Sequence, residues 1–311
     1  MNTQAVVLDA PGQLDVRVLA LNAIGAADVL IDVAFAGVST GTERLLWTGR
    51  MPPFPGMGYP LVPGYESVGR IVDAGPEAVG RIGETVFVPG ANCYEGARGL
   101  FGGNASRLIV PSRRATAVDS ALGADAVLLA LAATARHAIA GGAAPDLIVG
   151  HGVLGRLLAR IAIAEGNAAP TVWETDTARH AGAAGYVVVH PDMDPRRDYA
   201  AIYDASGAPD LLDTLIGRLQ RGGEIVLAGF YEAPLHFAFP SAFIREARLR
   251  VAAEWQPGDL AATTALVASN ALSLAGLITD HAPAHTAADA YPVAFSDAAC
   301  LKMVLDWSGV Q

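Results

Sequence analysis

One stretch, residues 147–176, constrains the fold of this chain more than any other, because it has the pattern of a strand, a turn, a helix and a second strand. Its turn reads GHGVLG, which fits the spacing GxGxxG. In that spacing we expect Gly150 to permit a tight turn, Gly152 to let the backbone approach a pyrophosphate, and Gly155 to let the helix lie close to the strand. Strand, glycines and helix together predict a dinucleotide site. The alternative is a surface βα unit with a glycine-rich turn.

An acidic residue follows at the end of the next predicted strand. Glu174 comes 19 residues after Gly155, close to the spacing of about 20 at which an acid accepts from the ribose hydroxyls. Because its carboxylate would repel the 2′-phosphate of NADP, we predict NAD as the cofactor. Asp176 is an alternative for this role, and His151 is expected to be a turn residue rather than a catalyst. The predicted cofactor site comprises Gly150, Gly152, Val153, Leu154, Gly155, Glu174, Arg179, Ser206 and Gly229.

Strand and helix patterns continue to alternate beyond this stretch, which is typical of a parallel, doubly wound sheet. Residues 1–118 instead carry short β-branched runs separated by Gly and Pro, and the tail at residues 277–307 returns to strand-like runs. We therefore expect an α/β protein of two domains. The dinucleotide-binding domain would span residues 119–270, and a β-rich domain would combine residues 1–118 with residues 271–311.

The overall charge argues against a nucleic-acid partner. The chain has a formal net charge of −10 and a pI near 5.1, whereas nucleic-acid phosphates require clustered Lys and Arg. The longest strongly apolar stretch, residues 126–133, is shorter than the roughly 18 residues of a spanning helix, and the N-terminus lacks the pattern of a signal peptide. Cys93 and Cys300 suggest no disulfide framework, although their pairing stays open. We expect a cytoplasmic protein without a membrane span that can visit a membrane surface.

A long segment, residues 42–63, is rich in Pro, Gly, Met and aromatic residues. Segments of this length without regular structure inside a compact domain are usually functional. Its large apolar side chains would form a lipophilic mouth if they are exposed, or would hold the loop down if they pack beneath it. They are Trp47, Met51, Phe54, Met57 and Tyr59.

Three segments resemble the medium-chain dehydrogenase/reductase superfamily. Residues 64–75, GYESVGRIVDAG, resemble its GHE-x-x-G-x-V-x-x-x-G stretch, residues 132–135 its linker helix, and residues 301–305 its closing strand. The resemblance covers essentially the whole chain. It implies a Rossmann sheet joined to a β-rich, GroES-like catalytic domain, and a nicotinamide-dependent oxidoreductase.

The zinc ligands of that superfamily are missing from this sequence. The positions that hold the catalytic metal in zinc-dependent members look like Ser39, Tyr65 and about Ala130 here, and of the structural cysteines only Cys93 remains. Residues 1–136 also contain no histidine, while zinc at such a site prefers His nitrogen and Cys sulfur. We therefore predict that no metal is bound.

A closer resemblance lies in residues 37–44, GVSTGTER. This S-x-G-T-E variant is similar to zinc-free members that act on bacteriochlorophyllides. It implies a dehydrogenase of bacteriochlorophyll biosynthesis that oxidises the 3-(1-hydroxyethyl) group of a tetrapyrrole to 3-acetyl, with Arg44 or Arg50 available to a propionate. A zinc-free quinone or enone reductase, or a dehydrogenase of another bulky apolar alcohol, remains an alternative, and a homodimer stays open.

Without zinc, another group must hold the alcohol oxygen and take its proton. The candidates are the side chains at the vacated metal position: Ser39, Thr42, Tyr65 and Glu66. The resemblance places Thr42 and Tyr65 on the substrate oxygen, as a proton relay with Glu66 as the carboxylate behind them. Alternatively, Tyr65 fills the space of the metal and Glu66 braces the domain interface.

Overall fold

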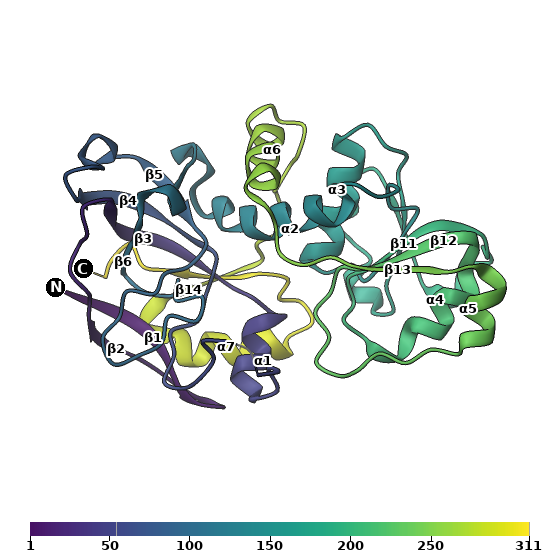
Figure 1. The fold of residues 1–311 in the computed structure, drawn as a ribbon, viewed down its shortest axis with the longest axis horizontal. Coiled ribbons are helices and arrows are strands. Elements are labelled where there is room, and N and C mark those ends of the chain that lie inside the picture. Colours follow the sequence, from purple (N-terminus) through teal and green to yellow (C-terminus); the bar gives the residue numbers. More distant parts are fainter. Residues whose placement is uncertain (54, 311) are drawn as a thin grey trace. The chain divides into compact units, whose positions relative to one another are not determined.

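A computed structural model describes residues 1–53 and 55–310 and contains two compact units (Figure 1). The first unit comprises Met1–Ala130 and Ala275–Gln311, and the second comprises Leu131–Leu274. The first unit thus extends to residue 130, where the sequence predicted a boundary at 118. The additional residues include a 3₁₀ segment, η3 (Ser120–Leu128), whose buried residues pack on the sheet of the first unit.

The first unit is built mainly from antiparallel strands. These are β1 (Asn2–Ala10), β2 (Gln13–Ala20), β3 (Asp28–Val38), β4 (Ser67–Ala74), β5 (Thr85–Val88), β6 (Arg107–Pro111), β7 (Thr116–Ala117), β14 (Asp280–Pro283) and β15 (Met303–Asp306). β1 and β2 form a hairpin, and the others form a seven-stranded sheet in the order β14-β15-β3-β4-β5-β7, with β6 also paired to β3. β3 is central, and its apolar residues pack with Trp307 and the buried face of the C-terminal segment in one core.

Two helices complete the first unit, and neither was expected. α1 (Thr42–Thr48) begins within the segment predicted to be an irregular loop, and α7 (Ala287–Ser296) interrupts a tail predicted to be strand-like. α7 contains Pro292. Because proline normally ends a helix, the sequence pattern does not predict a helix here.

Of the two alternatives for residues 42–63, the structure supports the one in which the large apolar side chains hold the loop down. Met51 is only 4% exposed and joins a small core, formed with Leu8, Leu46 and Leu61, that Trp47, Met57 and Tyr59 pack against while half-buried. The apolar side chains therefore hold α1 and the following loop down. Phe54 lies outside the described residues.

The second unit is a parallel sheet with helices, as the sequence predicted. Its strands are β8 (Leu147–Val149), β9 (Thr171–Trp173), β10 (Val187–Val189), β11 (Tyr199–Asp204), β12 (Leu219–Leu227) and β13 (Arg248–Val251), and its helices are α2 (Leu129–Ile139), α3 (Val153–Ala164), α4 (Leu212–Arg218), α5 (Phe239–Arg245) and α6 (Pro257–Ala268). The strand order β10-β9-β8-β11-β12-β13 reverses between β8 and β11. The carboxyl ends of the strands at such a reversal form the crevice in which doubly wound sheets bind ligands.

One segment of 20 residues, Ser120–Ile139, is long and apolar enough to cross a membrane by length and composition, with a mean hydropathy of 1.3 over an 18-residue window. However, 56% of that window is buried inside the protein, and Gly123 breaks the helical backbone with φ 51° and ψ −128°. Both features are those of a helix in a protein core.

Candidate functional site

The glycine-rich turn connects β8 to α3 in the second unit. Gly150 has a φ of 96°, in the left-handed region that favours glycine. A Cβ added at Gly155 would lie 1.9 Å from the carbonyl oxygen of Gly150, so only glycine allows this approach of helix and strand, whereas one added at Gly152 would meet nothing within 4 Å. Gly152 caps α3 without a side-chain hydrogen bond, which leaves the first N–H groups, including those of Val153 and Leu154, for a ligand.

Glu174 is held against this turn. One carboxylate oxygen accepts from the backbone N–H of His151 at 3.0 Å and the other from the N–H of Asp176 at 2.9 Å. The Asp176 side chain instead caps a short 3₁₀ helix by accepting from Ala178 N–H. The acid at the turn is therefore Glu174.

His151 is a structural residue. Its ring is fully buried, with Nδ1 2.6 Å from the Arg179 carbonyl oxygen and Nε2 2.8 Å from the Tyr186 hydroxyl. Burial lowers the pKa of His151 to about 4, so the ring is neutral at physiological pH. The carbonyl of Arg179 also accepts from Arg156, and these contacts pin the segment after Glu174 to the turn.

Two further predicted cofactor residues lie beside the glycines. A Cβ added at Gly150 would be 3.3 Å from the Ser206 nitrogen, and one added at Gly229 would be 3.0 Å from the Gly207 nitrogen. Ser206 donates its N–H and its hydroxyl to Asp204 at the end of β11. The loops after β8, β11 and β12 thus meet at the predicted edge of the sheet.

The candidate alcohol site lies in the first unit, where β3 ends and β4 begins. The Ser39 hydroxyl and the Tyr65 hydroxyl are 2.7 Å apart, and Tyr65 is also hydrogen-bonded to Thr42, the first residue of α1. Burial, with Glu66 nearby, raises the pKa of Tyr65 well above its ordinary value. The structure therefore brings together the three predicted hydroxyls, and the phenol keeps its proton at neutral pH.

Glu66 does not take the place expected for it behind these hydroxyls. Both of its carboxylate oxygens accept from the Lys302 ammonium, at 2.7 and 3.0 Å, and among the described residues it accepts no hydrogen bond from Ser39, Thr42 or Tyr65. Glu66 is 0% exposed and Lys302 1% exposed. This ion pair offsets the cost of burying the carboxylate charge.

Sequence reasoning assigned no role to a second acid, Glu43, in the first turn of α1. It is fully buried, and its carboxylate accepts from the Ser39 N–H at 2.9 Å, from the Tyr291 hydroxyl at 2.6 Å and from the Asn104 amide at 3.2 Å. Its place in the S-x-G-T-E motif was visible, but its partners on α7 and in a distant loop were not.

In the part of the chain that the structure describes, no three His, Cys, Asp or Glu side chains form a group that could hold a metal ion. Ser39 and Tyr65 offer hydroxyl oxygens, the donors that zinc favours least at such sites. Cys93 and Cys300 are buried free thiols, which decides the question of their pairing.

Comparison with known proteins identifies the family. Residues 25–120 match the alcohol dehydrogenase GroES-like domain. Over 99% of both chains, the sequence is 59% identical to the 2-desacetyl-2-hydroxyethyl bacteriochlorophyllide A dehydrogenase of Rhodobacter capsulatus and 57% identical to that of Cereibacter sphaeroides. The chain belongs to this dehydrogenase family. Both the superfamily and the oxidoreductase class predicted from the sequence are confirmed.

Solved structures of more distant dehydrogenases share the fold. The 2R,3R-butanediol dehydrogenase of Bacillus subtilis is 17% identical, with a TM-score of 0.85 over 98% of this chain and 99% of its own. An alcohol dehydrogenase of Escherichia coli CFT073, complexed with NADH, is 19% identical, with a TM-score of 0.84 over 98% of this chain and 99% of its own. The predicted combination of a Rossmann sheet and a GroES-like domain is thereby confirmed for this dehydrogenase.

Proposed function

We propose that this dehydrogenase catalyses the NAD-dependent oxidation of the 3-(1-hydroxyethyl) group of a bacteriochlorophyllide to 3-acetyl, in bacteriochlorophyll a biosynthesis. The observation that carries this proposal is the identity of 57–59%, over essentially the full length, to two proteins named for that substrate. The glycine turn of the second unit and the hydroxyl group cluster of the first unit supply the binding groups that such a reaction needs.

The cofactor half of the proposal rests on the turn after β8. Free N–H groups at the start of α3 suit a pyrophosphate, and open space at Gly152 suits its close approach. Glu174, fixed by two backbone N–H groups, presents its carboxylate where the ribose 2′-hydroxyl would donate and a 2′-phosphate would be repelled. A bound nicotinamide would accept the hydride from the alcohol carbon.

The substrate half rests on Ser39, Thr42 and Tyr65. These hydroxyls would hold the alcohol oxygen. As the hydride leaves the alcohol carbon, the alcohol proton would pass along the hydroxyl chain to solvent water, with each hydroxyl accepting one proton and releasing its own, so that Tyr65 stays protonated. The exposed Arg44, in α1, would bind a propionate of the tetrapyrrole, as would Arg50 after α1, whose Nε also donates to the Thr48 hydroxyl. Because such a pigment partitions into lipid, we also expect a cytoplasmic enzyme that meets it at a membrane surface.

The decisive experiment supplies the purified protein with NAD and a hydroxyethyl bacteriochlorophyllide and follows the pigment absorption. We expect conversion to the acetyl pigment with stoichiometric NADH, and hardly any turnover of ethanol. If simple secondary alcohols react as fast as the pigment, the enzyme is a dehydrogenase of other bulky alcohols. If instead NAD(P)H reduces quinones or enones and the pigment is inert, it belongs with the reductases.

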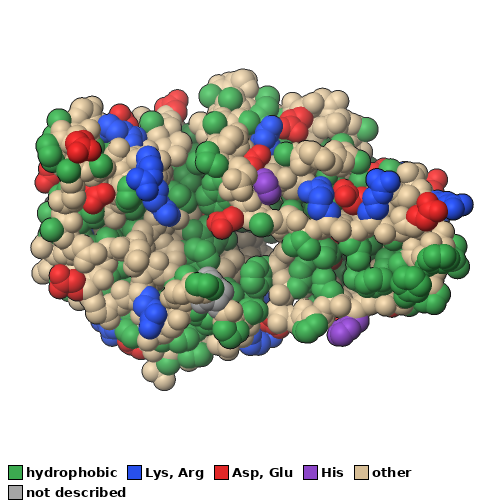
Figure 2. All heavy atoms as spheres, in the orientation of Figure 1, with side chains coloured by type: hydrophobic (Ala, Val, Ile, Leu, Met, Phe, Trp, Pro, Cys, Tyr) green, Lys and Arg blue, Asp and Glu red, His purple; other side chains and the backbone are tan. Residues whose placement is uncertain are grey.

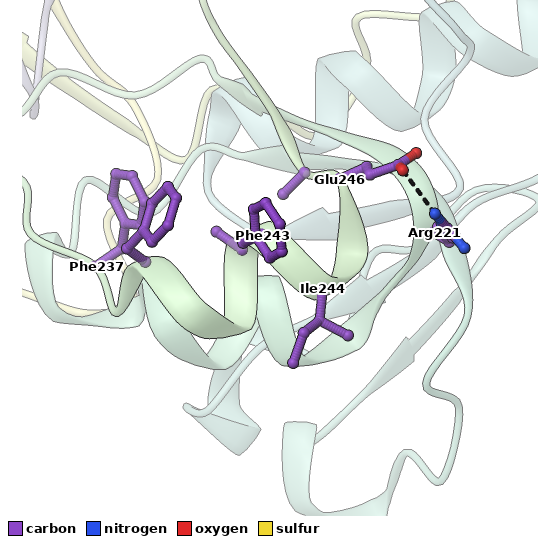
Figure 3. A pocket seen from close by; sticks show the side chains of 8 residues that line it. Arg221, Phe237, Phe243, Ile244 and Glu246 are labelled. Carbon is purple, nitrogen blue, oxygen red and sulfur yellow. Dashed lines mark hydrogen bonds and ion pairs between the residues drawn. The ribbon is translucent and has the colours of Figure 1, made fainter.

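We further propose that two copies associate through the second unit. β13 is one of the two edge strands of the six-stranded sheet, β10 being the other, and Figure 2 shows hydrophobic side chains gathered over the part of the second unit that carries α5 in Figure 1. α5 contributes a pocket in which Phe237, Phe243 and Ile244 lie along one side and the ion pair of Arg221 and Glu246 lies at one end (Figure 3). The exposed large apolar residues here are Phe230, Phe237, Phe239, Phe243, Ile244, Leu249 and Val251.

The area of this surface suits a second copy. The seven side chains are 41–76% exposed; at about 200 Å² each they present on the order of 800 Å², which matches the roughly 800 Å² per partner of a standard interface. Edge-to-edge pairing of two β13 strands would also satisfy their unpaired backbone groups.

Sedimentation velocity tests the association. We expect a dimer for the wild type and a monomer for Phe243→Asp, while Val79→Asp, at an exposed apolar position in the first unit (55% against 68% for Phe243), should stay dimeric. A wild type that remains monomeric at tens of micromolar would refute the proposal.

A further inference from the structure

A buried acid beside the alcohol site, Glu43, has no part in the reaction proposed above. Its side chain is 0% exposed. Its Oε1 accepts from the backbone N–H of Ser39, and its Oε2 accepts from the hydroxyl of Tyr291 and the amide of Asn104. Glu43 thus connects the end of β3, helix α7 and the loop before β6 at one carboxylate.

The two buried acids of this region differ in their partners. Glu66 is neutralised by the ammonium of Lys302 at 2.7 Å. Among the described residues, the hydrogen-bond donors to Glu43 are all neutral. The charged groups near it are Glu66 and Lys302, and the phenols are Tyr291 and Tyr65. Burial raises the pKa of Glu43 to about 7, with Glu66 adding to the rise and the Tyr291 and Ser39 hydrogen bonds opposing it. Glu43 can therefore exist in either form near neutral pH.

Asn104 lets the cluster hold both forms of this carboxyl group. Its amide nitrogen donates to Glu43 and to the Tyr291 oxygen, while its Oδ1 is buried and has no hydrogen-bond partner among the described residues. Turning the amide by half a revolution would present Oδ1 to Glu43, where it could accept from a protonated carboxyl group. Neither form leaves Glu43 without a partner.

We propose that Glu43 is a positioning residue of the alcohol site, which fixes Ser39 through its backbone N–H and does so most firmly as the carboxylate. The Ser39 hydroxyl lies 2.7 Å from that of Tyr65, so a displacement of the Ser39 backbone would open the pair that holds the alcohol oxygen. An ionised acceptor makes the stronger hydrogen bond, and misplacement by about 1 Å can cost about 10²-fold in rate. This inference rests on the proposed function.

Glu43→Gln tests the inference because it keeps an oxygen for the Ser39 N–H and removes the charge. We expect kcat to fall about tenfold with KM for the pigment nearly unchanged, since an interaction that orients the reacting groups is lost. The wild-type kcat should rise with pH near 7 as Glu43 ionises, and this rise should be absent from Glu43→Gln. Tyr291→Phe keeps the ring contacts with Trp47 and Phe295 and should show a smaller loss in the same direction.

Asp194→Asn provides a matched control in the second unit. Asp194 is also a buried acid, 7% exposed, that accepts from Trp173 and Tyr199, and it differs from Glu43 in having the Arg218 guanidinium 3.9 Å away. Its replacement should lower the melting temperature and leave the pH dependence of kcat unchanged. If Glu43→Gln behaves in the same way, Glu43 is merely structural and the inference is wrong. If Glu43→Gln does not fold, Tyr291→Phe decides between the two outcomes.

A measurement without substrate separates this inference from the proposed function. The amide hydrogen of Ser39 should exchange at least tenfold faster in Glu43→Gln than in the wild type, because its acceptor is weaker. If the pigment is inert but this exchange accelerates, the proposed substrate is wrong and the positioning by Glu43 is supported. If the pigment is oxidised and neither exchange nor kcat changes, the positioning role is refuted.

Discussion

Replacing Lys302 with methionine should destabilise the protein in a way that depends strongly on pH. The ammonium of Lys302 lies 2.7 and 3.0 Å from the two carboxylate oxygens of Glu66 and also donates to the Val38 carbonyl at 3.3 Å. Methionine approximates the length of the lysine stem, so Lys302→Met chiefly removes the charge. Glu66, 0% exposed, would then be buried without a neutralising partner.

The magnitude follows from the cost of neutralising Glu66. Burial without the ammonium would disfavour the charged form of Glu66 in the variant, so the carboxyl group would bind a proton on folding. At pH 7, protonating a carboxyl group whose unfolded pKa is about 4.3 costs about 4 kcal/mol, within the range of about 3–5 kcal/mol for breaking a buried pair. A group with a raised folded pKa favours folding below its unfolded pKa, and that contribution is lost as pH rises. At pH 5 the same cost is about 1 kcal/mol.

Urea unfolding at pH 5 and pH 7 measures both values. We expect Lys302→Met to lose about 3–5 kcal/mol relative to wild type at pH 7 and about 1 kcal/mol at pH 5. The double variant Glu66→Gln with Lys302→Met should recover most of the loss at pH 7, because no buried charge remains. Equal losses at the two pH values, or a double variant as unstable as Lys302→Met, would show that the charge of Glu66 does not set the stability.

Three further predictions concern the reaction. Glu174→Ala should lower the ratio of kcat/KM for NAD to kcat/KM for NADP by about tenfold or more, because the 2′-phosphate of NADP is no longer repelled. An unchanged ratio would mean that another residue sets the preference for NAD over NADP. Thr42→Val and Tyr65→Phe should each lower kcat by about 10²-fold with NAD binding unchanged, and a loss within about threefold would leave positioning alone to explain the rate. A strong chelator should not change the rate, and elemental analysis that finds one zinc per chain, lost together with activity, would contradict this.

The elements that the sequence predicted well are those whose pattern is local. β5 (Thr85–Val88) is one of the short runs of β-branched and aromatic residues, bounded by Gly and Pro, that predict strands in residues 1–118. The glycine turn was predicted for the same reason: each of its glycines acts within one strand, turn and helix. α1 and α7 were missed because α1 has only seven residues and α7 contains Pro292, so neither produces a long helical period.

The candidate alcohol site was only partly predictable, because the hydrogen-bond partners of its buried acids lie far away in the sequence. Glu66 pairs with a residue 236 positions away, and Glu43 bonds one 248 positions away. The sequence motifs show that Glu43 and Glu66 are present, but their spacing does not say which of the two carboxylates pairs with a positive charge. The chain has one lysine, and its position beside Glu66 decides the matter. Glu66 is thereby fixed as one half of an ion pair, while Glu43, held by neutral donors, is the acid of this site whose charge can change at neutral pH.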